Sequence, residues 1–194
     1  MRAIAISGSP RQGGNTEILV RRCLDGLARR GIGGDFVTLR DKLIRPCRAC
    51  GTCAQRRDGT CSIQDDDFHP LLGAMREADI IVLGSPVYFG SAAPELMALL
   101  DRAGYVSRQS GGFFSRKLGG PIAVARRAGH NFTFAQLLFW YMINDMIVPG
   151  SSYWNVALAR EAGAVESDEE GLATVDRFAE NLAWLAERLG TGGP

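Results

Sequence analysis

The stretch that decides the fold is Ser7-Gly8-Ser9-Pro10-Arg11-Gln12-Gly13-Gly14-Asn15-Thr16. It follows the apolar run Ala3-Ile4-Ala5-Ile6 and leads directly into a helical pattern. A strand, a turn rich in Gly and Ser, and a helix in this order bring free backbone N–H groups to the positive end of the helix. This arrangement is typical of a phosphate-binding site.

The side chains of this stretch also suit a phosphate. Arg11 offers a cation that can neutralise part of a phosphate dianion, and further donors come from Ser9, Asn15 and Thr16. Two of the glycines have the spacing of G-x-x-x-x-G-K-[ST], but the Lys and the following Ser or Thr are missing, and there is no G-x-G-x-x-G fingerprint. The stretch therefore predicts a site that holds a terminal monophosphate without hydrolysing it. The alternative is a turn that only caps the helix.

Length and charge favour a single globular domain. The chain has 194 residues and a formal net charge of +1, so we expect one domain over residues 1–190, a flexible tail over 191–194, and neither nucleic acid nor membrane as a partner. The first strand starts too close to Met1 for a signal peptide, and the longest apolar run, 137–143, is too short to span a bilayer. We therefore expect a cytoplasmic protein with reduced thiols.

Strand-like and helix-like patterns alternate along the chain. Strands are predicted near the start and at 35–39, 79–84, 121–125 and 146–148, and helices at 15–30, from Pro94, around 137–143 and at 172–189. This alternation is typical of a parallel sheet with helices on both faces. Residues 137–143 are apolar on nearly every side, which predicts either a deeply buried core helix or a subunit interface.

A second loop belongs to the same predicted edge of the sheet. Residues 85–91, Ser-Pro-Val-Tyr-Phe-Gly-Ser, follow the third strand. Ligands of doubly wound sheets lie beyond the carboxyl ends of the strands, so this loop should face the phosphate site. It offers backbone groups and two aromatic rings to a flat heterocycle.

Together the two loops resemble those of the flavodoxin-like NAD(P)H-dependent FMN reductases. The resemblance rests on Gly8-Ser9-Pro10-Arg11, Gly14-Asn15-Thr16 and the run 85–90. It implies a flavodoxin-like, doubly wound sheet of five parallel strands in the order 2-1-3-4-5. It also implies an FMN site formed by Ser9, Arg11, Asn15, Thr16, Pro86, Val87, Tyr88, Phe89 and Gly90.

A third loop follows the predicted fourth strand and departs from the Gly-richer segment of that family. Its Arg126 or Arg127 could contact the flavin or the phosphate of a nicotinamide cofactor, whereas the alternative is a pair of solvated arginines. His130 is interpreted as a surface histidine rather than a proton donor.

Residues 41–66 lack periodicity, and a loop of this length in a compact domain is usually functional. They carry Cys47, Cys50, Cys53 and Cys61 in the spacing C-x2-C-x2-C-x7-C. Closely spaced thiolates of this kind are typical of an iron–sulfur cluster, whereas structural zinc more often uses two separated pairs. Zinc and plain or redox-active thiols remain alternatives. Cys23 falls on an apolar helix stripe and is interpreted as a core residue.

The segment from Pro46 to Asp67 resembles the iron–sulfur flavoproteins, in which a compact cysteine motif holds a [4Fe-4S] cluster beside FMN. Asp65 to Asp67 are expected to cap the next helix. The resemblance implies an FMN-dependent oxidoreductase that receives electrons from NAD(P)H or a ferredoxin-like protein. It also implies a homodimer or homotetramer.

No side chain is expected to be catalytic, because the chemistry would occur at N5 of FMN. One alternative is an NAD(P)H-dependent reductase of flavins, quinones or nitro compounds that carries no cluster. A further alternative is a non-catalytic redox sensor.

Overall fold

The computed structural model describes residues 1–190 and contains a five-stranded parallel sheet in the order β2-β1-β3-β4-β5. The strands are β1 (Ala3–Ser7), β2 (Gly34–Thr38), β3 (Ile80–Pro86), β4 (Leu118–Ala125) and β5 (Val156–Leu158). This order confirms the predicted flavodoxin-like fold. The predicted tail, 191–194, lies outside the described residues.

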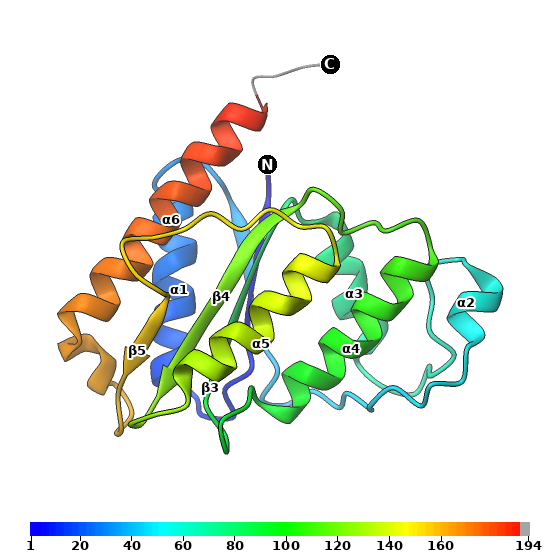
Figure 1. Ribbon diagram of the computed structural model, residues 1–194, viewed down its shortest axis with the longest axis horizontal. Helices are drawn as coiled ribbons and strands as arrows, with labels where there is room; N and C mark the ends of the chain where they lie inside the picture. Colours follow the sequence, from blue (N-terminus) through cyan, green and yellow to red (C-terminus); the bar gives the residue numbers. More distant parts are fainter. Residues whose placement is uncertain (191–194) are drawn as a thin grey trace.

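Helices cover both faces of the sheet (Figure 1). On one face lie α1 (Asn15–Ala28) and α6 (Glu169–Gly190), with the short 3-10 helix η1 (Ala164–Ser167) before α6. The other face is covered by α3 (Phe68–Glu77), α4 (Pro94–Gln109) and α5 (His130–Ile143). None of the helices in the described part of the chain is long and apolar enough to cross a membrane.

The central strands are mostly apolar because each contributes to two cores. Ile4, Ile6, Ile81 and Leu83 face the α3–α5 side, whereas their alternating neighbours face α1 and α6. At Gly84, an added Cβ would lie 2.1 Å from Cγ2 of Val20. The missing side chain lets the first turns of α1 lie directly against β3, which brings the two predicted site loops together.

The prediction of the fifth strand is wrong. β5 is Val156–Leu158 and pairs with the end of β4, whereas Ile147 forms only an isolated bridge with Leu118 at the start of β4. Both segments run along the outer side of β4, but Pro149 and Gly150 separate them. The apolar residues 146–148 thus resemble a strand in sequence without continuing as one.

Of the two alternatives for residues 137–143, the deeply buried core helix is wrong, because one side of α5 is exposed. Its inner side includes Trp140, whose Nε1 donates to Leu100 O at 2.8 Å, and Tyr141, whose hydroxyl lies 2.9 Å from Gly120 O. Its outer side leaves large apolar side chains exposed, namely Phe132, Phe139, Met142 and Ile143. Residues 137–143 are apolar on nearly every side, although only one side of the helix packs against the sheet.

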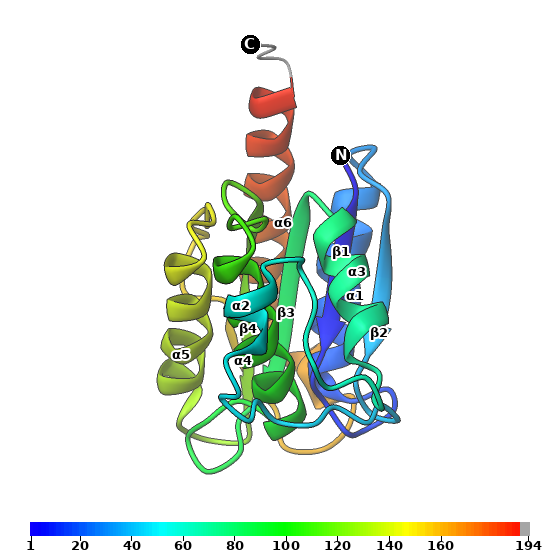
Figure 2. The ribbon, with the colours of Figure 1, turned by 90° about the vertical axis from the view of Figure 1, so that its right-hand side faces the viewer.

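The cysteine-rich segment, 41–66, contains one short helix, α2 (Thr52–Arg56). This helix lies at the outer edge of the molecule beside α4, away from the sheet (Figures 1 and 2). Asp67 precedes α3 without making a side-chain capping bond, whereas Oδ1 of Asp66 accepts the Phe68 N–H at 3.3 Å. Of the aspartates expected to cap α3, the structure therefore gives this role to Asp66.

Candidate functional site

A cleft of about 230 Å³ lies at the carboxyl ends of β1, β3 and β4. It brings together seven residues of the predicted FMN site, namely Ser9, Arg11, Asn15, Thr16, Pro86, Val87 and Tyr88. The remaining lining residues are Gly14, Val124, Arg126, Ala159, Arg160 and Ala162. The two loops that the sequence placed at one edge of the sheet thus both line one cleft.

The loop between β1 and α1 has the shape of an anion-binding site. Ser9 is buried, and its Oγ accepts the backbone N–H of Arg11 at 3.2 Å, which closes the loop on itself. Gly14 is the N-cap residue of α1 and has no side chain to occupy the first-turn N–H groups. A Cβ on Gly14 would lie 3.2 Å from the Ser9 Oγ and from the Arg11 carbonyl oxygen. The loop therefore fits a phosphate group on backbone N–H donors and Arg11.

Asn15 lines the cleft, but its side chain already has two protein partners. Nδ2 donates to Glu161 O at 2.8 Å, and Oδ1 accepts the Val165 N–H at 3.2 Å. The amide therefore joins the start of α1 to the segment that follows β5. Its contribution to a bound phosphate would come from its backbone N–H in the first turn of α1.

The loop between β3 and α4 forms a tight turn. The backbone N–H of Val87 donates to Val124 O at 2.9 Å, which fixes the start of the loop on β4. Phe89 and Gly90 occupy the tip with φ values of 51° and 78°. They do not line the cleft, unlike their predicted partners 86–88, and Phe89 is fully exposed.

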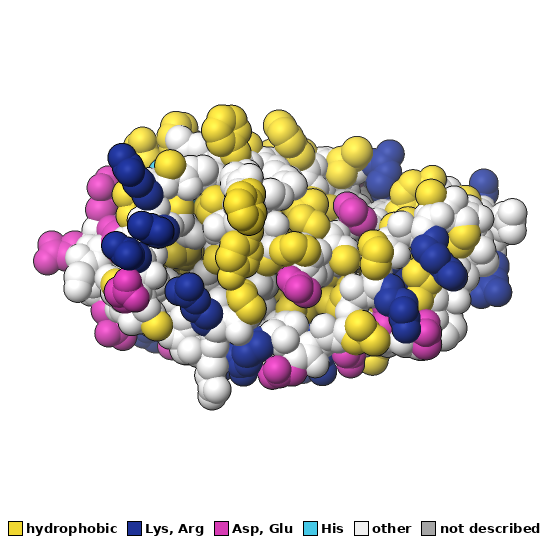
Figure 3. All heavy atoms as spheres, turned by 90° about the horizontal axis from the view of Figure 1, so that it is seen from below, with side chains coloured by type: hydrophobic (Ala, Val, Ile, Leu, Met, Phe, Trp, Pro, Cys, Tyr) yellow, Lys and Arg dark blue, Asp and Glu magenta, His cyan; other side chains and the backbone are white. Residues whose placement is uncertain are grey.

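The cleft is positively charged. Arg11, Arg126 and Arg160 line it, and no Asp or Glu is among its lining residues. Figure 3, the view from below, shows Lys and Arg side chains toward both the left and the right of this face, with Asp and Glu side chains among them and hydrophobic side chains over its middle. Nε of Arg160 lies 3.2 Å from Oε1 of Glu161, so this cation is partly paired. Such a cleft favours an anionic ligand.

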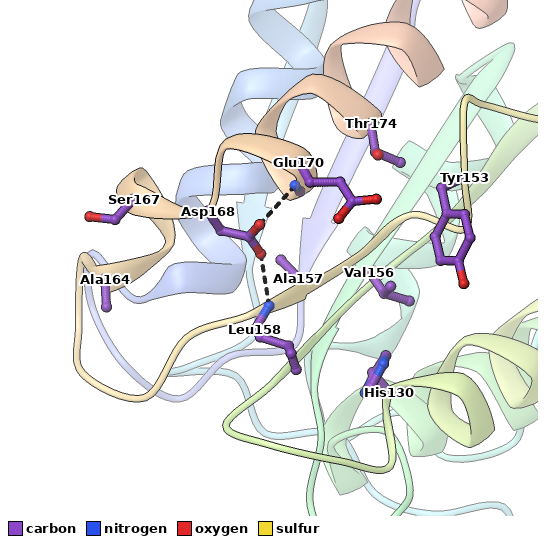
Figure 4. A pocket seen from close by; sticks show the side chains of 11 residues that line it. His130, Tyr153, Val156, Ala157, Leu158, Ala164, Ser167, Asp168, Glu170 and Thr174 are labelled. Carbon is purple, nitrogen blue, oxygen red and sulfur yellow. Dashed lines mark hydrogen bonds between the residues drawn. The ribbon is translucent and has the colours of Figure 1, made fainter.

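A larger cavity of about 440 Å³ lies beside the edge strand β5 and the start of α6 (Figure 4). His130 and Tyr153 reach into it from α5 and the segment before β5. Asp168 accepts the N–H groups of Leu158 and Gly171, each at 2.9 Å, so its carboxylate ties β5 to α6. None of the predicted cofactor residues lines this cavity. His130 thus lies outside the cleft, and so does the exposed Arg127.

The wall of the cleft that follows β5 was not predicted from the sequence. Ala159, Arg160 and Ala162 line the site because β5 ends at Leu158. With the last strand placed at 146–148, these residues were too far along the chain to be assigned to the edge of the sheet. Had the fifth strand been placed correctly, the Arg in the loop directly after it would have indicated this part of the cleft.

All four predicted cysteine ligands border one small cavity between the cysteine-rich segment and α4. Hydrogen bonds with the hydroxyl groups of Ser62, at 3.2 Å, and Thr52, at 3.4 Å, lower the pKa of the Cys50 thiol to about 7. Burial raises the pKa of the Cys53 thiol. The cysteine cavity and the FMN cleft share no lining residue.

The described residues 1–190 contain no group of three or more His, Cys, Asp or Glu side chains arranged as metal ligands. The predicted cluster is therefore not confirmed, although four thiols around one cavity are the donor type that iron–sulfur clusters require. All five cysteines are free thiols. Cys23 lies in the core, where burial raises its pKa to about 12, as expected for a packing residue.

Comparison with known proteins relates the chain to flavin enzymes. A family model described as NADPH-dependent FMN reductase matches residues 1–161. An iron–sulfur flavoprotein of Methanocaldococcus jannaschii is 37% identical over 196 residues, covering 97% of this chain and 99% of that protein. An iron–sulfur flavoprotein of Methanosarcina thermophila is 33% identical over 197 residues, covering 97% of each.

Solved structures agree on the fold. RosB, solved with bound 8-demethyl-8-formylriboflavin-5′-phosphate, superimposes with a TM-score of 0.77 at 17% identity, covering 98% of this chain and 80% of RosB. A flavodoxin, WrbA-like protein of Agrobacterium tumefaciens gives a TM-score of 0.68 at 13% identity, covering 96% of this chain and 98% of that one. At these identities the similarity shows the fold alone.

Proposed function

The chain belongs to the NADPH-dependent FMN reductase family, and we propose that it is an FMN-dependent oxidoreductase that carries a [4Fe-4S] cluster on its cysteine-rich segment. Family membership supports the coarser function, an FMN-dependent oxidoreductase. The observation that carries the proposal is the positively charged cleft in which seven predicted FMN residues meet.

FMN would bind with its phosphate at the first turn of α1. The free N–H groups of that turn and Arg11 would hold the phosphate, while Ser9 and Gly14 shape the loop around it. Pro86, Val87 and Tyr88 would provide the surface for the flavin ring, and Phe89 and Gly90 would act through the turn that orients Tyr88. Arg126 would add positive charge near the ring or the ribityl chain.

When bound, FMN would supply hydride or single-electron transfer at its N5. The chain's own residues would bind and orient the cofactor. We therefore assign no catalytic side chain and propose that the protein acts by positioning FMN.

Two features support a cluster. Relatives at 37% and 33% identity are named iron–sulfur flavoproteins, and Cys47, Cys50, Cys53 and Cys61 surround one cavity. When bound, a [4Fe-4S] cluster would supply one-electron transfer. The chain would then couple a two-electron donor to one-electron carriers. Zinc and plain thiols are the alternatives.

The electron donor would be NAD(P)H or a ferredoxin-like protein. The family's description favours NADPH. Without a cluster, the same cleft would serve a simple reductase of flavins, quinones or nitro compounds. A cytoplasmic location stays a prediction.

The exposed side of α5 supports an oligomer. Phe132, Phe139, Met142 and Ile143 expose between 56% and 76% of their surface. Contiguous apolar side chains of this kind mark protein interfaces. We propose that a second copy of the chain covers them in a homodimer or homotetramer.

Anaerobic purification, a visible spectrum, and assays of iron and acid-labile sulfide test the proposal. The expected result is flavin absorbance together with about four irons per chain. Flavin without iron, even after reconstitution, would leave a reductase without a cluster. No flavin binding after addition of FMN would overturn the whole proposal.

A further inference from the structure

Arg102 is a buried charge on α4 behind the cysteine cavity. Only 1% of its surface is exposed, and it lines the cavity together with the four cysteines. A buried guanidinium needs several acceptors to offset the loss of water. The partners that Arg102 finds all belong to the cysteine-rich segment or its continuation into α3.

The guanidinium ties the two ends of the segment together. Nη1 donates to Arg45 O at 3.1 Å, and Nη2 donates to Ile63 O at 3.1 Å. These carbonyl groups lie on either side of the four cysteines in the chain. One side chain of α4 thus holds together the two chain positions that flank the cysteines.

Asp66 joins the same hydrogen-bond network. Its carboxylate accepts hydrogen bonds from both Nη atoms of Arg102 and also accepts the Arg45 N–H at 2.9 Å. Both side chains of the ion pair are fully buried. The Phe68 ring stacks on the guanidinium, with 3.8 Å between Cζ and the ring centroid. These contacts hold the guanidinium in one position.

The pair is oriented with respect to the cysteines. Arg102 lines their cavity, whereas Asp66 does not. The N–H at Nε of Arg102 is buried and has no hydrogen-bond partner, although every other part of the guanidinium is used. A buried donor of this kind calls for an acceptor. Arg102 rather than Asp66 therefore borders the cavity that the thiols line, and its Nε–H is left without an acceptor.

We propose that Arg102 is the positioning residue of the cysteine site: it fixes both ends of the segment and sets a buried positive charge, with its free Nε–H, beside the sulfur atoms of a bound cluster. This inference rests on the proposed [4Fe-4S] cluster. A cluster held by four thiolates is negatively charged, so a nearby cation and a hydrogen bond to sulfur favour the reduced state. Arg102 then raises the reduction potential of the cluster.

The test is an anaerobic redox titration of the reconstituted protein, followed by electron paramagnetic resonance. Arg102→Met should shift the midpoint potential of the cluster to a more negative value. Asp66→Asn, which removes the opposite charge, should shift it to a more positive value. A purely structural role would lower the amount of cluster in both variants without moving the potentials in opposite directions.

Arg48→Met is the matched control, because Arg48 lines the same cavity but is exposed. Its potential should change less than that of Arg102→Met, since water screens an exposed charge. Arg102→Lys keeps the charge but not the fork of donors. It should hold the potential near that of the wild type while the chelator concentration that removes half of the iron falls about 10-fold or more.

Retention of FMN shows which variants are folded. Equal cluster potentials in the wild type, Arg102→Met and Asp66→Asn would overturn this inference and leave the proposed function intact. A wild-type protein that binds FMN but no iron would overturn both the cluster and the role of Arg102. If Arg102→Met, Arg102→Lys and Asp66→Asn all lost FMN, the ion pair would support the whole fold rather than the cysteine site. That result would overturn the inference as well.

Discussion

Tyr88 and Ser91 exchange two backbone hydrogen bonds, of 2.9 and 3.0 Å, across the turn that follows β3. Two residues with positive φ, Phe89 and Gly90, form the tip of this turn. A two-residue turn with this geometry favours Asn-Gly, because a bulky residue is strained at positive φ. The chain thus accepts local strain at a loop that forms one wall of the cleft.

Relief of this strain should stabilise the protein. Phe89→Asn should raise the free energy of unfolding by about 0.5–1 kcal/mol, measured by urea denaturation of the FMN-free protein. Gly90→Ala should lower it by about 1 kcal/mol, which makes it the opposite control. FMN affinity should stay unchanged in Phe89→Asn, because Phe89 does not line the cleft. A large loss of affinity would mean that the ring itself contacts the flavin.

Arg11→Ala should weaken the binding of FMN. Loss of a charge-assisted hydrogen bond of about 1.5–3 kcal/mol corresponds to a roughly 10- to 100-fold higher Kd, measured by titration of flavin fluorescence. Riboflavin, which lacks the phosphate, should bind the variant and the wild type alike. Arg127→Ala is the control, since Arg127 is exposed and does not line the cleft. Equal FMN affinity in Arg11→Ala would contradict the assigned position of the phosphate.

The sequence predicted most of this cleft because its two loops are local motifs. The loop before α1 needs only a strand, glycines and a helix start, all contiguous in the chain. Arg160 could not be found in this way, because its place depends on β5, a strand of three residues. So short a strand carries little periodicity of its own and is fixed by its pairing with β4.

Asn15→Ala should destabilise the fold around the cleft. The substitution removes the hydrogen bonds to Glu161 O and from Val165 N, and it leaves these backbone groups without partners. The free energy of unfolding should fall by about 1–3 kcal/mol, measured by urea denaturation. The exposed Asn131 provides the control, since Asn131→Ala should change stability by less than about 0.5 kcal/mol. Equal losses of unfolding free energy in both variants would show that the two hydrogen bonds of the Asn15 side chain have no special role.

The cysteine-rich segment was predictable only in part. Its cysteine spacing and lack of periodicity indicated a functional loop, and the structure gathers all four cysteines at one cavity. The support from α4 was missed, because a charged residue in an amphipathic helix is usually interpreted as solvent-exposed. Arg102 nevertheless falls on the same stripe as Leu99 and Val106, both of which are buried. A lone Arg on a buried stripe was the available signal.

The pair formed by Asp66 and Arg102 should make stability fall in acid. Burial acts to raise the pKa of Asp66, but the hydrogen bonds from Arg102 and from two backbone N–H groups outweigh it and lower the pKa below its ordinary value. The resulting stability is present above the unfolded pKa of about 3.9 and is lost as the pH falls through the lower folded value. Urea denaturation of the metal-free protein across this range should show the loss.

Asp35→Asn provides a control for this acid dependence, because Asp35 pairs with Arg2 at the surface, where both side chains are more than half exposed. It should change the acid dependence little, since exposed pairs contribute about 0–1 kcal/mol. Asp66→Asn should abolish the steep part of the pH dependence and lower stability at neutral pH. An unchanged pH profile in Asp66→Asn would refute the assignment to this pair.

The outer side of α5 should determine the oligomeric state. Phe139 is 70% exposed and Ile143 is 60% exposed, and they lie one helical turn apart. Because a charge buried in an apolar interface is costly, the double variant Phe139→Asp/Ile143→Asp should dissociate an oligomer that covers these side chains. Light scattering coupled to size-exclusion chromatography would detect the lower mass. Trp184→Asp is the control: Trp184 is 57% exposed on α6, on the opposite face of the sheet, and its replacement should leave the mass unchanged. The same mass for the wild type and the α5 variant would contradict this assignment of the interface.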